Sequence, residues 1–495
     1  MFKKFIRDLV NYIPSKLLPA ITSFISTPIF TRLFLPVTFG NYALATALSD
    51  FLYAVSCSGL GSGIFRYYPV YKAKDSLNSF FSIYTLFISV VIIVTSILAV
   101  IFLLLFRSFF SDELFSLLLI GVLYFFLSSF FIILTEVLRA QEKSRQYTFF
   151  QLVTTYGGLI LSLVLVIFFH TKVQGLLWGN IVILFAFLPI TFHLVTKGSQ
   201  IHPRFIQRSD LREIWQFAWP LTLGNMAMWG LRLSDRYIIG MFRPESEVGI
   251  YSVAYNISNK SIDILVTLFI LTMSPMIMNS WVNHGRQETE KALSMITRIY
   301  LILGVPAVIG ISVLAYPVVK LLTSQPYYDG YKVVSVVGMS SFFWGLTQIA
   351  NRGLLIGKST RQFANHQLIA AIFNISLNLF LIPRLGFIAA GVTTLAGYIL
   401  LFSLQAHASQ KFLTWRISFR SLINILIASG GMGAAIFYLY NFLQRQGMKN
   451  IFDLTICLAV GVLLYFGVLF ILGEANRDEK KQILDVFLQL RSRAE

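Results

Sequence analysis

The sequence is poor in charged residues for its length. Asp, Glu, Lys and Arg together make up 13% of its 495 residues, whereas soluble domains carry about 25%. A chain that is 56% hydrophobic cannot cover its apolar surface with so few polar side chains. The composition excludes a water-soluble multidomain protein, a disordered chain and a nucleic-acid-binding protein, and it leaves the lipid bilayer as the solvent.

Cysteine and catalytic motifs are also scarce. Cys57 and Cys457 are the two cysteines, and each lies within an apolar run, so no disulfide framework or thiolate metal site is expected. There is no P-loop, no His-Glu-x-x-His and no Cys-x-x-Cys motif. The longest gap between apolar runs, 197–213, is too short for a catalytic domain. We therefore predict a protein that is not an enzyme and that has no metal and no cofactor.

Long apolar runs dominate the chain instead. A membrane-spanning helix needs about 20 predominantly apolar residues, and helices satisfy their own backbone hydrogen bonds in hydrocarbon. The sequence therefore predicts an all-α integral membrane protein with about 14 transmembrane helices. The predicted spans are 12–34, 41–65, 80–106, 114–138, 148–169, 175–196, 214–241, 249–279, 292–318, 332–356, 364–383, 388–407, 421–443 and 451–473.

The basic residues predict the orientation of the chain. When the loops are taken alternately, about 25 Lys and Arg residues fall in the set that includes both termini and about 7 in the other set. Basic loops stay in the cytoplasm. We therefore predict a multi-pass protein of the cell inner membrane with both termini in the cytoplasm. The two ends, 1–13 and 474–495, have the apolar spacing of interfacial amphipathic helices.

An internal repeat relates the first span to the seventh. Pro19, Thr31-Arg32, Pro36 and Phe39-Gly40-Asn41-Tyr42 recur as Pro220, Asp235-Arg236, Pro244 and Val248-Gly249-Ile250-Tyr251. Parallel repeats of this kind are typical of transporters that bind substrate between the repeats. We predict two six-helix lobes, two extra helices and a cytoplasmic tail, with the boundaries 1–200, 201–410, 411–473 and 474–495.

Charged residues inside the spans are the candidates for function. Each costs about 2.5–3.5 kcal/mol on insertion scales. Basic residues outnumber acids there, which favours an anionic cargo. The candidate substrate-binding residues are Arg232, Lys260, Arg236, Arg32, Lys16 and Arg352, and the candidate ion-coupling or counter-charge residues are Asp263, Asp50 and Asp235.

Two structural roles would also account for these charges. Lys16, Arg32 and Arg352 lie near span ends, where a side chain can reach the interface. Four charged residues lie deeper in their spans, namely Arg232, Lys260, Asp263 and Asp50. Lys260 with Asp263, Asp50 and also Lys16 belong to polar stripes with helical spacing. Such a stripe can line a water-filled cavity, or it can join helices through polar contacts. In the second case Asp263 with Lys260, or Asp235 with Arg232, would neutralise each other.

Several motifs resemble one family. They are Thr27-Pro28-Ile29-Phe30-Thr31-Arg32-Leu33, Phe39-Gly40-Asn41-Tyr42, Gly59-Leu60 leading to Arg66-Tyr67-Tyr68, and Ser234-Asp235-Arg236-Tyr237-Ile238-Ile239-Gly240 leading to Val248-Gly249-Ile250-Tyr251. The chain resembles the bacterial polysaccharide-export flippases, the Wzx-type lipid-linked oligosaccharide flippases of the multidrug/oligosaccharidyl-lipid/polysaccharide superfamily.

The resemblance implies a function. It implies alternating-access movement of an undecaprenyl-diphosphate-linked oligosaccharide across the cytoplasmic membrane for O-antigen (lipopolysaccharide), capsule or exopolysaccharide synthesis. It places Arg32 and Arg236 at matching motif positions, while Arg232 and Lys260 depend on their place in the spans. The expected partners are the lipid-linked substrate, membrane lipids, a polysaccharide polymerase and a chain-length regulator, with no nucleic acid.

Three alternatives remain at this point. A lipid II flippase and a multidrug exporter belong to the same superfamily, although a net-cationic interior disfavours a cationic drug. A membrane glycan polymerase or ligase would handle similar lipids, but such enzymes need a large outer loop that this chain lacks. The driving force is open between membrane potential, an ion gradient and consumption of the product outside.

Overall fold

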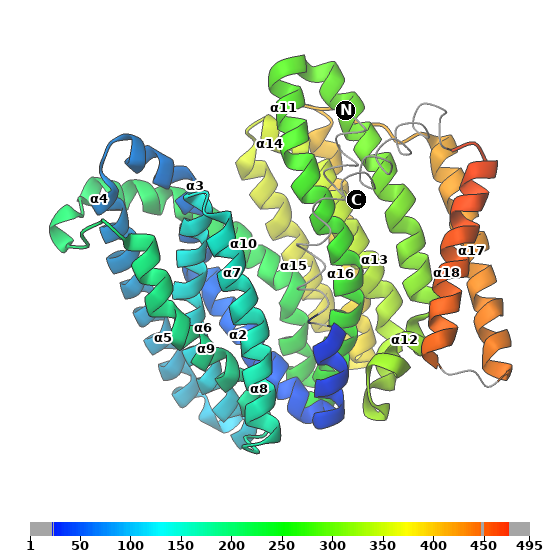
Figure 1. The fold of residues 1–495 in the computed structure, drawn as a ribbon, viewed down its shortest axis with the longest axis horizontal. Coiled ribbons are helices and arrows are strands. Elements are labelled where there is room, and N and C mark those ends of the chain that lie inside the picture. Colours follow the sequence, from blue (N-terminus) through cyan, green and yellow to red (C-terminus); the bar gives the residue numbers. More distant parts are fainter. Residues whose placement is uncertain (1–21, 23, 447–449, 475–495) are drawn as a thin grey trace, which may run out of the picture. The chain divides into compact units, whose positions relative to one another are not determined.

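The structure of this chain is a computed structural model that describes residues 22, 24–446 and 450–474. Every regular element in these residues is a helix (Figure 1), which confirms the predicted all-α membrane fold. The two predicted amphipathic ends, 1–13 and the tail beyond 474, lie outside the described residues.

Packing contacts group the chain into two compact units. Unit 1 comprises Met1–Leu33, Ile250–His366 and Phe387–Glu495, and unit 2 comprises Phe34–Gly249 and Gln367–Gly386. The units are not consecutive blocks of sequence, because the long helices α11 and α15 each contribute to both. The lobes inferred from the repeat, 1–200 and 201–410, stay a prediction.

Unit 2 contains the first half of the described helices. They are α2 (Pro36–Ser56), α3 (Ser58–Ala73), α4 (Leu77–Ser82), the π-helix η1 (Ile83–Phe87), α5 (Ile88–Leu105), η2 (Arg107–Phe109), α6 (Asp112–Ala140), α7 (Ser144–Leu152), the π-helix η3 (Val153–Gly157), α8 (Gly158–Ile167), α9 (Gln174–Thr196), η4 (Pro203–Phe205), α10 (Arg208–Phe242) and most of α15 (Thr360–Leu385).

Unit 1 contains residues 24–33, which are helical, and most of the second half of the chain. Its helices are α11 (Glu245–Val313) from Ile250 onward, α12 (Ala315–Leu322), η5 (Gln325–Gly330), α13 (Tyr331–Ala350), α14 (Arg352–Ile356), α16 (Phe387–Ser409), α17 (Phe419–Arg445) and α18 (Asn450–Ile471).

The number of spans differs from the predicted 14. Ten helices of the described chain are long and apolar enough to cross a membrane, or 11 when the bent pair α2 and α3 counts as one span. Three features explain the difference. Helix α11 holds two predicted spans on either side of a bend at Gly285 (φ 76°), α10 is too polar to qualify, and most of the first span precedes the described residues. The exact number of 14 is not confirmed.

The starts of α2 and α11 cross at very short range in unit 2. A Cβ atom at Gly249 would overlap the carbonyl oxygen of Pro36, and one at Gly40 would overlap that of Glu245. Each glycine therefore meets the carbonyl four positions before the other glycine. This reciprocal contact agrees with the repeat seen in the sequence, because equivalent segments that pack on each other make equivalent contacts.

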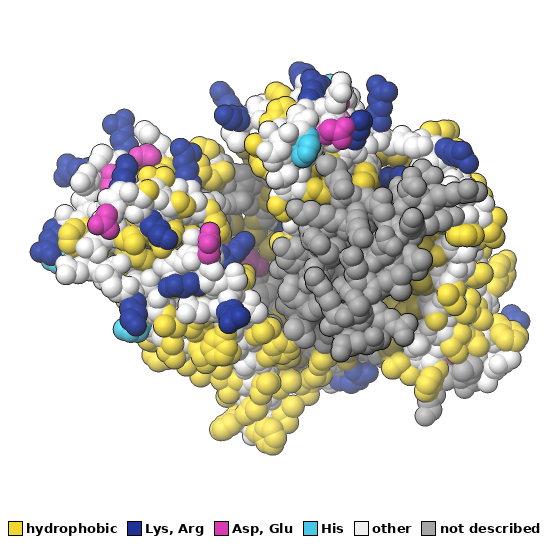
Figure 2. Space-filling view, turned by 45° about the horizontal axis from the view of Figure 1, so that its top comes forward, with side chains coloured by type: hydrophobic (Ala, Val, Ile, Leu, Met, Phe, Trp, Pro, Cys, Tyr) yellow, Lys and Arg dark blue, Asp and Glu magenta, His cyan; other side chains and the backbone are white. Residues whose placement is uncertain are grey.

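Loops predicted to share one side lie together at one end of unit 2. The backbone N–H of Gln200 donates to Asn78 Oδ1 (2.8 Å), and Gln141 Nε2 donates to the carbonyl of Val195 (3.1 Å). Lys and Arg side chains gather over this end in Figure 2, at the left, above a hydrophobic flank. The exposed basic residues there include Lys72, Lys74, Lys143, Arg145, Lys197, Arg204, Arg208 and Arg212. That this end faces the cytoplasm stays a prediction.

The end of α18 is held by a carboxylate in unit 1. Arg298 on α11 donates from Nε to Glu474 Oε1 (3.0 Å), and Asn424 on α17 donates to Oε2 (3.0 Å). The Ser421 hydroxyl also donates to this carboxylate. The Glu474 side chain is 6% exposed. These contacts give Arg298, one of the charges inside the predicted spans, a structural partner.

Both cysteines are buried. Cys57 lies at the 49° bend between α2 and α3, and Cys457 lies within α18. Neither side chain has measurable exposure, as expected for small side chains in apolar runs.

Candidate functional site

An acidic residue and two arginines come together in unit 2. Asp50 lies in the interior of the span formed by α2 and α3. Two arginines on α10 attract its carboxylate, Arg236 more strongly than Arg232. Helices α2 and α10 pack against each other. The sequence predicted all three residues as candidates, and the structure brings them into one group.

Arg236 is fixed by its neighbours. Its Nη1 lies 3.3 Å from Asp235 Oδ1, and the two side chains are 6% and 1% exposed. The same Nη1 donates to the carbonyl oxygen of Arg232 at 3.2 Å, and the backbone N–H of Arg236 donates to Asp235 Oδ1 at 2.8 Å. A buried guanidinium needs such a counter-charge. Asp235 therefore has Arg236 as an ion-pair partner.

Arg232 and Asp50, in contrast, are exposed although they lie inside predicted spans. A charged side chain that faces hydrocarbon is costly, so such residues face a water-filled space or another charge. Their mutual attraction satisfies the second condition. Their exposure also shows that neither side chain is enclosed between helices, as that of a residue that only joins helices would be.

Three tyrosines lie within electrostatic range of the Asp50 carboxylate. They are Tyr42 of α2, Tyr124 of α6 and Tyr237 of α10. The Tyr237 hydroxyl donates to the carbonyl of Leu44 at 2.8 Å, which fixes the ring. Sequence reasoning predicted none of the three as parts of the site. Tyr42 and Tyr237 lie in the motifs that carry the family resemblance and could have been found, whereas nothing in the sequence relates Tyr124 to α2.

An aromatic cluster adjoins the charged group. The ring of Trp229 on α10 lies 4.7 Å from that of Phe51 on α2 and 6.0 Å from that of Tyr237, measured between centroids. Trp229 and Phe51 are both partly exposed. Trp229, Arg232 and Arg236 follow each other at helical spacing, so they share one face of α10.

The site can bind an anion. Arginine offers N–H donors in a planar fork that matches the oxygens of phosphate and carboxylate groups. The group contains two arginines, and Arg232 and Asp50 are its exposed members. An anionic ligand can therefore take the place of Asp50 as the partner of Arg232. Tyrosine hydroxyls supply further donors.

The predicted residues in unit 1 form a different arrangement. Asn259 Nδ2 donates to Ser341 Oγ (2.9 Å), which joins α11 to α13. One turn further on α11, Asp263 acts electrostatically on Tyr300. Among the described residues no ion pair joins Asp263 to Lys260, so the mutual neutralisation expected as an alternative is not seen in the structure.

In the described chain, Arg352 and Arg32, two further predicted residues, make contacts within their own segments and not with Lys260 or Asp263. Arg352 donates from Nε to the carbonyl of Gln348 (3.1 Å) on its own chain segment, and Arg32 donates to the carbonyl of Pro28 (3.0 Å) and is exposed. Such contacts fit residues near span ends. Lys16 lies outside the described residues.

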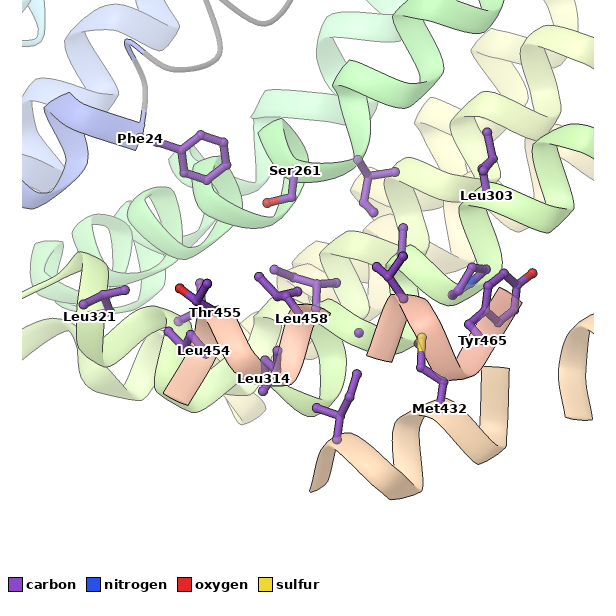
Figure 3. Close-up of a pocket in the computed structure, with 18 of the residues that line it drawn as sticks. Phe24, Ser261, Leu303, Leu314, Leu321, Met432, Leu454, Thr455, Leu458 and Tyr465 are labelled. Carbon is purple, nitrogen blue, oxygen red and sulfur yellow. The ribbon is translucent and has the colours of Figure 1, made fainter. Parts of the chain in front are cut away.

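Unit 1 also contains an apolar cavity of about 610 Å³. Figure 3 shows side chains from α11, α12, α17 and α18 around it, with Phe24 at one side and Tyr465 at the other. Ser261 and Thr455 bring hydroxyl groups to a lining that is otherwise almost entirely hydrophobic. The cavity therefore suits a hydrocarbon chain.

The helical architecture matches that of known transporters. It is similar to a structure titled "Lipid II flippase MurJ, inward closed conformation", with a TM-score of 0.75 and 17% identity over 93% of this chain and 98% of that one. It is also similar to an inward-facing multidrug resistance MATE family transporter of the MOP superfamily, with a TM-score of 0.58 and 14% identity over 82% and 94% of the two chains. The fold is thus the one shared by MurJ and MATE transporters.

Sequence comparison then gives the family. The family described as "Polysaccharide biosynthesis protein" matches residues 29–332, and the chain belongs to it. The resemblance inferred from the motifs is confirmed.

Two curated relatives are similar at lower coverage. One is "Probable low-salt glycan biosynthesis flippase Agl15" of Haloferax volcanii, 22% identical over 47% of this chain and 48% of the relative. The other is "Probable lipid II flippase MurJ" of Haemophilus influenzae, 24% identical over 44% and 47%. The matches thus span about half the length of these relatives.

Proposed function

We propose that the protein is a flippase that moves an oligosaccharide linked to undecaprenyl diphosphate across the cytoplasmic membrane for O-antigen, capsule or exopolysaccharide synthesis. The observation that carries this proposal is the group formed by Asp50, Arg232 and Arg236 inside the spans of unit 2. The family supports it, since its members are described as polysaccharide biosynthesis proteins.

The proposed cargo has three chemically different parts. The diphosphate would accept hydrogen bonds from Arg232 and Arg236, and hydroxyl groups around Asp50 would meet the sugars. The hydrocarbon chain matches the apolar cavity of unit 1 in chemistry. A polar head cannot cross hydrocarbon unaided, because each unsatisfied polar group costs several kcal/mol there. A polar cavity that opens alternately to the two sides removes this barrier.

The remaining predicted residues have less direct roles in the proposal. Lys260, Arg32, Lys16 and Arg352 would add positive charge along the path of the diphosphate. With both termini in the cytoplasm, an inside-negative potential favours outward movement of an anion by about 2.3 kcal/mol per charge per 100 mV. A polymerase and a chain-length regulator are the proposed partners, because they act on the flipped product.

Lipid II is the second candidate cargo. The structural likeness to a lipid II flippase covers nearly the whole chain, and one curated relative carries the same name. Lipid II also combines a polyprenyl chain, a diphosphate and sugars, so the same site chemistry would hold it. The two cargoes differ in the groups beyond the first sugar.

The experiment uses purified protein in liposomes with either lipid supplied on one leaflet. Translocation is measured as the appearance of sugar that a membrane-impermeant reagent can reach. Arg232→Gln should lower transport at least about tenfold, because hydrogen bonds to charged groups contribute about 1.5–3 kcal/mol. The preferred cargo is the lipid that the wild-type protein moves faster.

A matched control separates binding from folding. Lys143 is exposed in the turn between α6 and α7, so Lys143→Gln should leave transport unchanged. Arg232 is also exposed, and its replacement by Gln should not alter protein abundance. If Arg232→Gln moves both lipids at the wild-type rate, the proposed anion site is rejected. If the wild-type protein moves neither lipid, the proposed function is rejected.

A further inference from the structure

The aromatic cluster beside the arginines has no role in holding a diphosphate. Trp229 contacts Phe51 across the α2 and α10 interface, and both side chains stay partly exposed. A tryptophan that only joined two helices would bury its ring and pair its indole N–H. The Nε1 donor of Trp229 is buried and has no hydrogen-bond partner among the described residues. Unpaired buried donors are rare and call for an explanation.

The position of Trp229 relative to the arginines is defined by the helix. Trp229 precedes Arg232 by three residues on the same face of α10, which corresponds to an axial separation of about 4.5 Å. Arg236 lies one further turn along. A ligand whose anionic group contacts Arg232 therefore lies within about one helical turn of the indole.

We propose that Trp229, with Phe51 packed against its flank, is the platform for the sugar ring attached directly to the diphosphate, and that this contact determines which sugar the protein accepts. The inference rests on the proposed function. A pyranose has an apolar face of C–H groups that stacks on an aromatic ring and a rim of hydroxyl oxygens. A small movement of the indole would bring its unpaired N–H to such an oxygen.

The probes are farnesyl diphosphate and the same lipid carrying one glucose, galactose or N-acetylglucosamine residue. Binding to the purified full-length protein is measured by isothermal titration calorimetry in detergent. The wild-type protein should bind at least one glycosylated probe about tenfold more tightly than farnesyl diphosphate, a ratio in keeping with one aromatic contact. No preference for any glycosylated probe would overturn the proposal.

Substitutions of Trp229 test the contact directly. Trp229→Leu should abolish the preference while binding farnesyl diphosphate like the wild type, which also shows that the protein is folded. Trp229→Phe keeps a ring but no N–H donor and should retain about a threefold preference. A tenfold preference in Trp229→Leu, or none in Trp229→Phe, would overturn the stacking.

Two controls make the failures distinguishable. Trp219 lies on the same helix and is 47% exposed, away from the arginines, so Trp219→Leu should keep the tenfold preference. Arg232→Gln should weaken binding of all probes by about tenfold without changing the preference. If Arg232→Gln has no effect on any probe, the anion site of the proposed function fails. If only the Trp229 results fail, the sugar platform alone is rejected.

Discussion

Replacement of Gly249 by alanine tests the close crossing of α2 and α11. An ideal Cβ at this position overlaps the carbonyl oxygen of Pro36 and lies 2.8 Å from the carbonyl carbon and 3.0 Å from Cα of the same residue. All three atoms belong to backbone, so no side-chain rotation can relieve the contact. The two helix starts would have to move apart.

The expected loss of stability follows from two opposing terms. Overpacking of a close contact costs about 1–3 kcal/mol and occasionally more, and a backbone contact belongs at the upper end. Alanine gains up to about 1 kcal/mol over glycine in a helix. The net destabilisation of Gly249→Ala should be about 2 kcal/mol.

Gly310 provides a control within the same helix. A Cβ there meets no atom within 4 Å, so Gly310→Ala should keep the helix gain and match or exceed wild-type stability. Apparent melting temperatures of the detergent-solubilised proteins, taken at one heating rate, give the comparison. If the apparent melting temperature of Gly249→Ala equals that of Gly310→Ala and is at or above the wild-type value, the close crossing described for unit 2 is wrong.

Three further predictions concern other parts of the chain. A reporter fused after Lys143 should report cytoplasm and one fused near Asp112 the outside, and interchanged signals would reject the orientation. Glu474→Ala should lower the apparent melting temperature of the purified protein by several degrees, since it removes the buried carboxylate that accepts from Arg298 Nε and from Asn424; unchanged melting would contradict the contacts at the end of α18. Asp263→Asn should stop transport in liposomes, and addition of Lys260→Gln should not restore it, because no ion pair joins the two residues in the described chain; restored transport that still responds to an imposed ion gradient would instead make Asp263 a counter-charge for Lys260.

Hydropathy predicts most of this fold because it needs no tertiary information. A long apolar run in hydrocarbon forms a helix because the helix satisfies its own backbone hydrogen bonds. The all-α membrane architecture therefore follows from the sequence. The exact number of spans is not confirmed, and two of the reasons lie in α10 and α11. The polar residues of α10 lower its mean hydropathy. The bend in α11 depends on the backbone conformation of Gly285, which cannot be read from the sequence.

The candidate site was predictable in part for the same reason. Asp50, Arg232 and Arg236 stand out because charge inside a span is costly. Their assembly into one group depends on the packing of α2 against α10, and Tyr124 enters from α6, far away in sequence. The ion pair between Asp235 and the adjacent Arg236 was not predicted, because helical spacing relates residues three or four positions apart and says nothing of direct neighbours.

The burial of both native thiols has a practical consequence for labelling. Cys57 and Cys457 are inaccessible in the folded chain, and the sequence contains no other cysteine. Maleimide reagents applied to intact membranes should therefore leave the unmodified protein unlabelled. A single cysteine introduced at an exposed position would then report its own accessibility without prior removal of the native thiols, and the same background would serve spin labels and fluorophores that follow movement during transport.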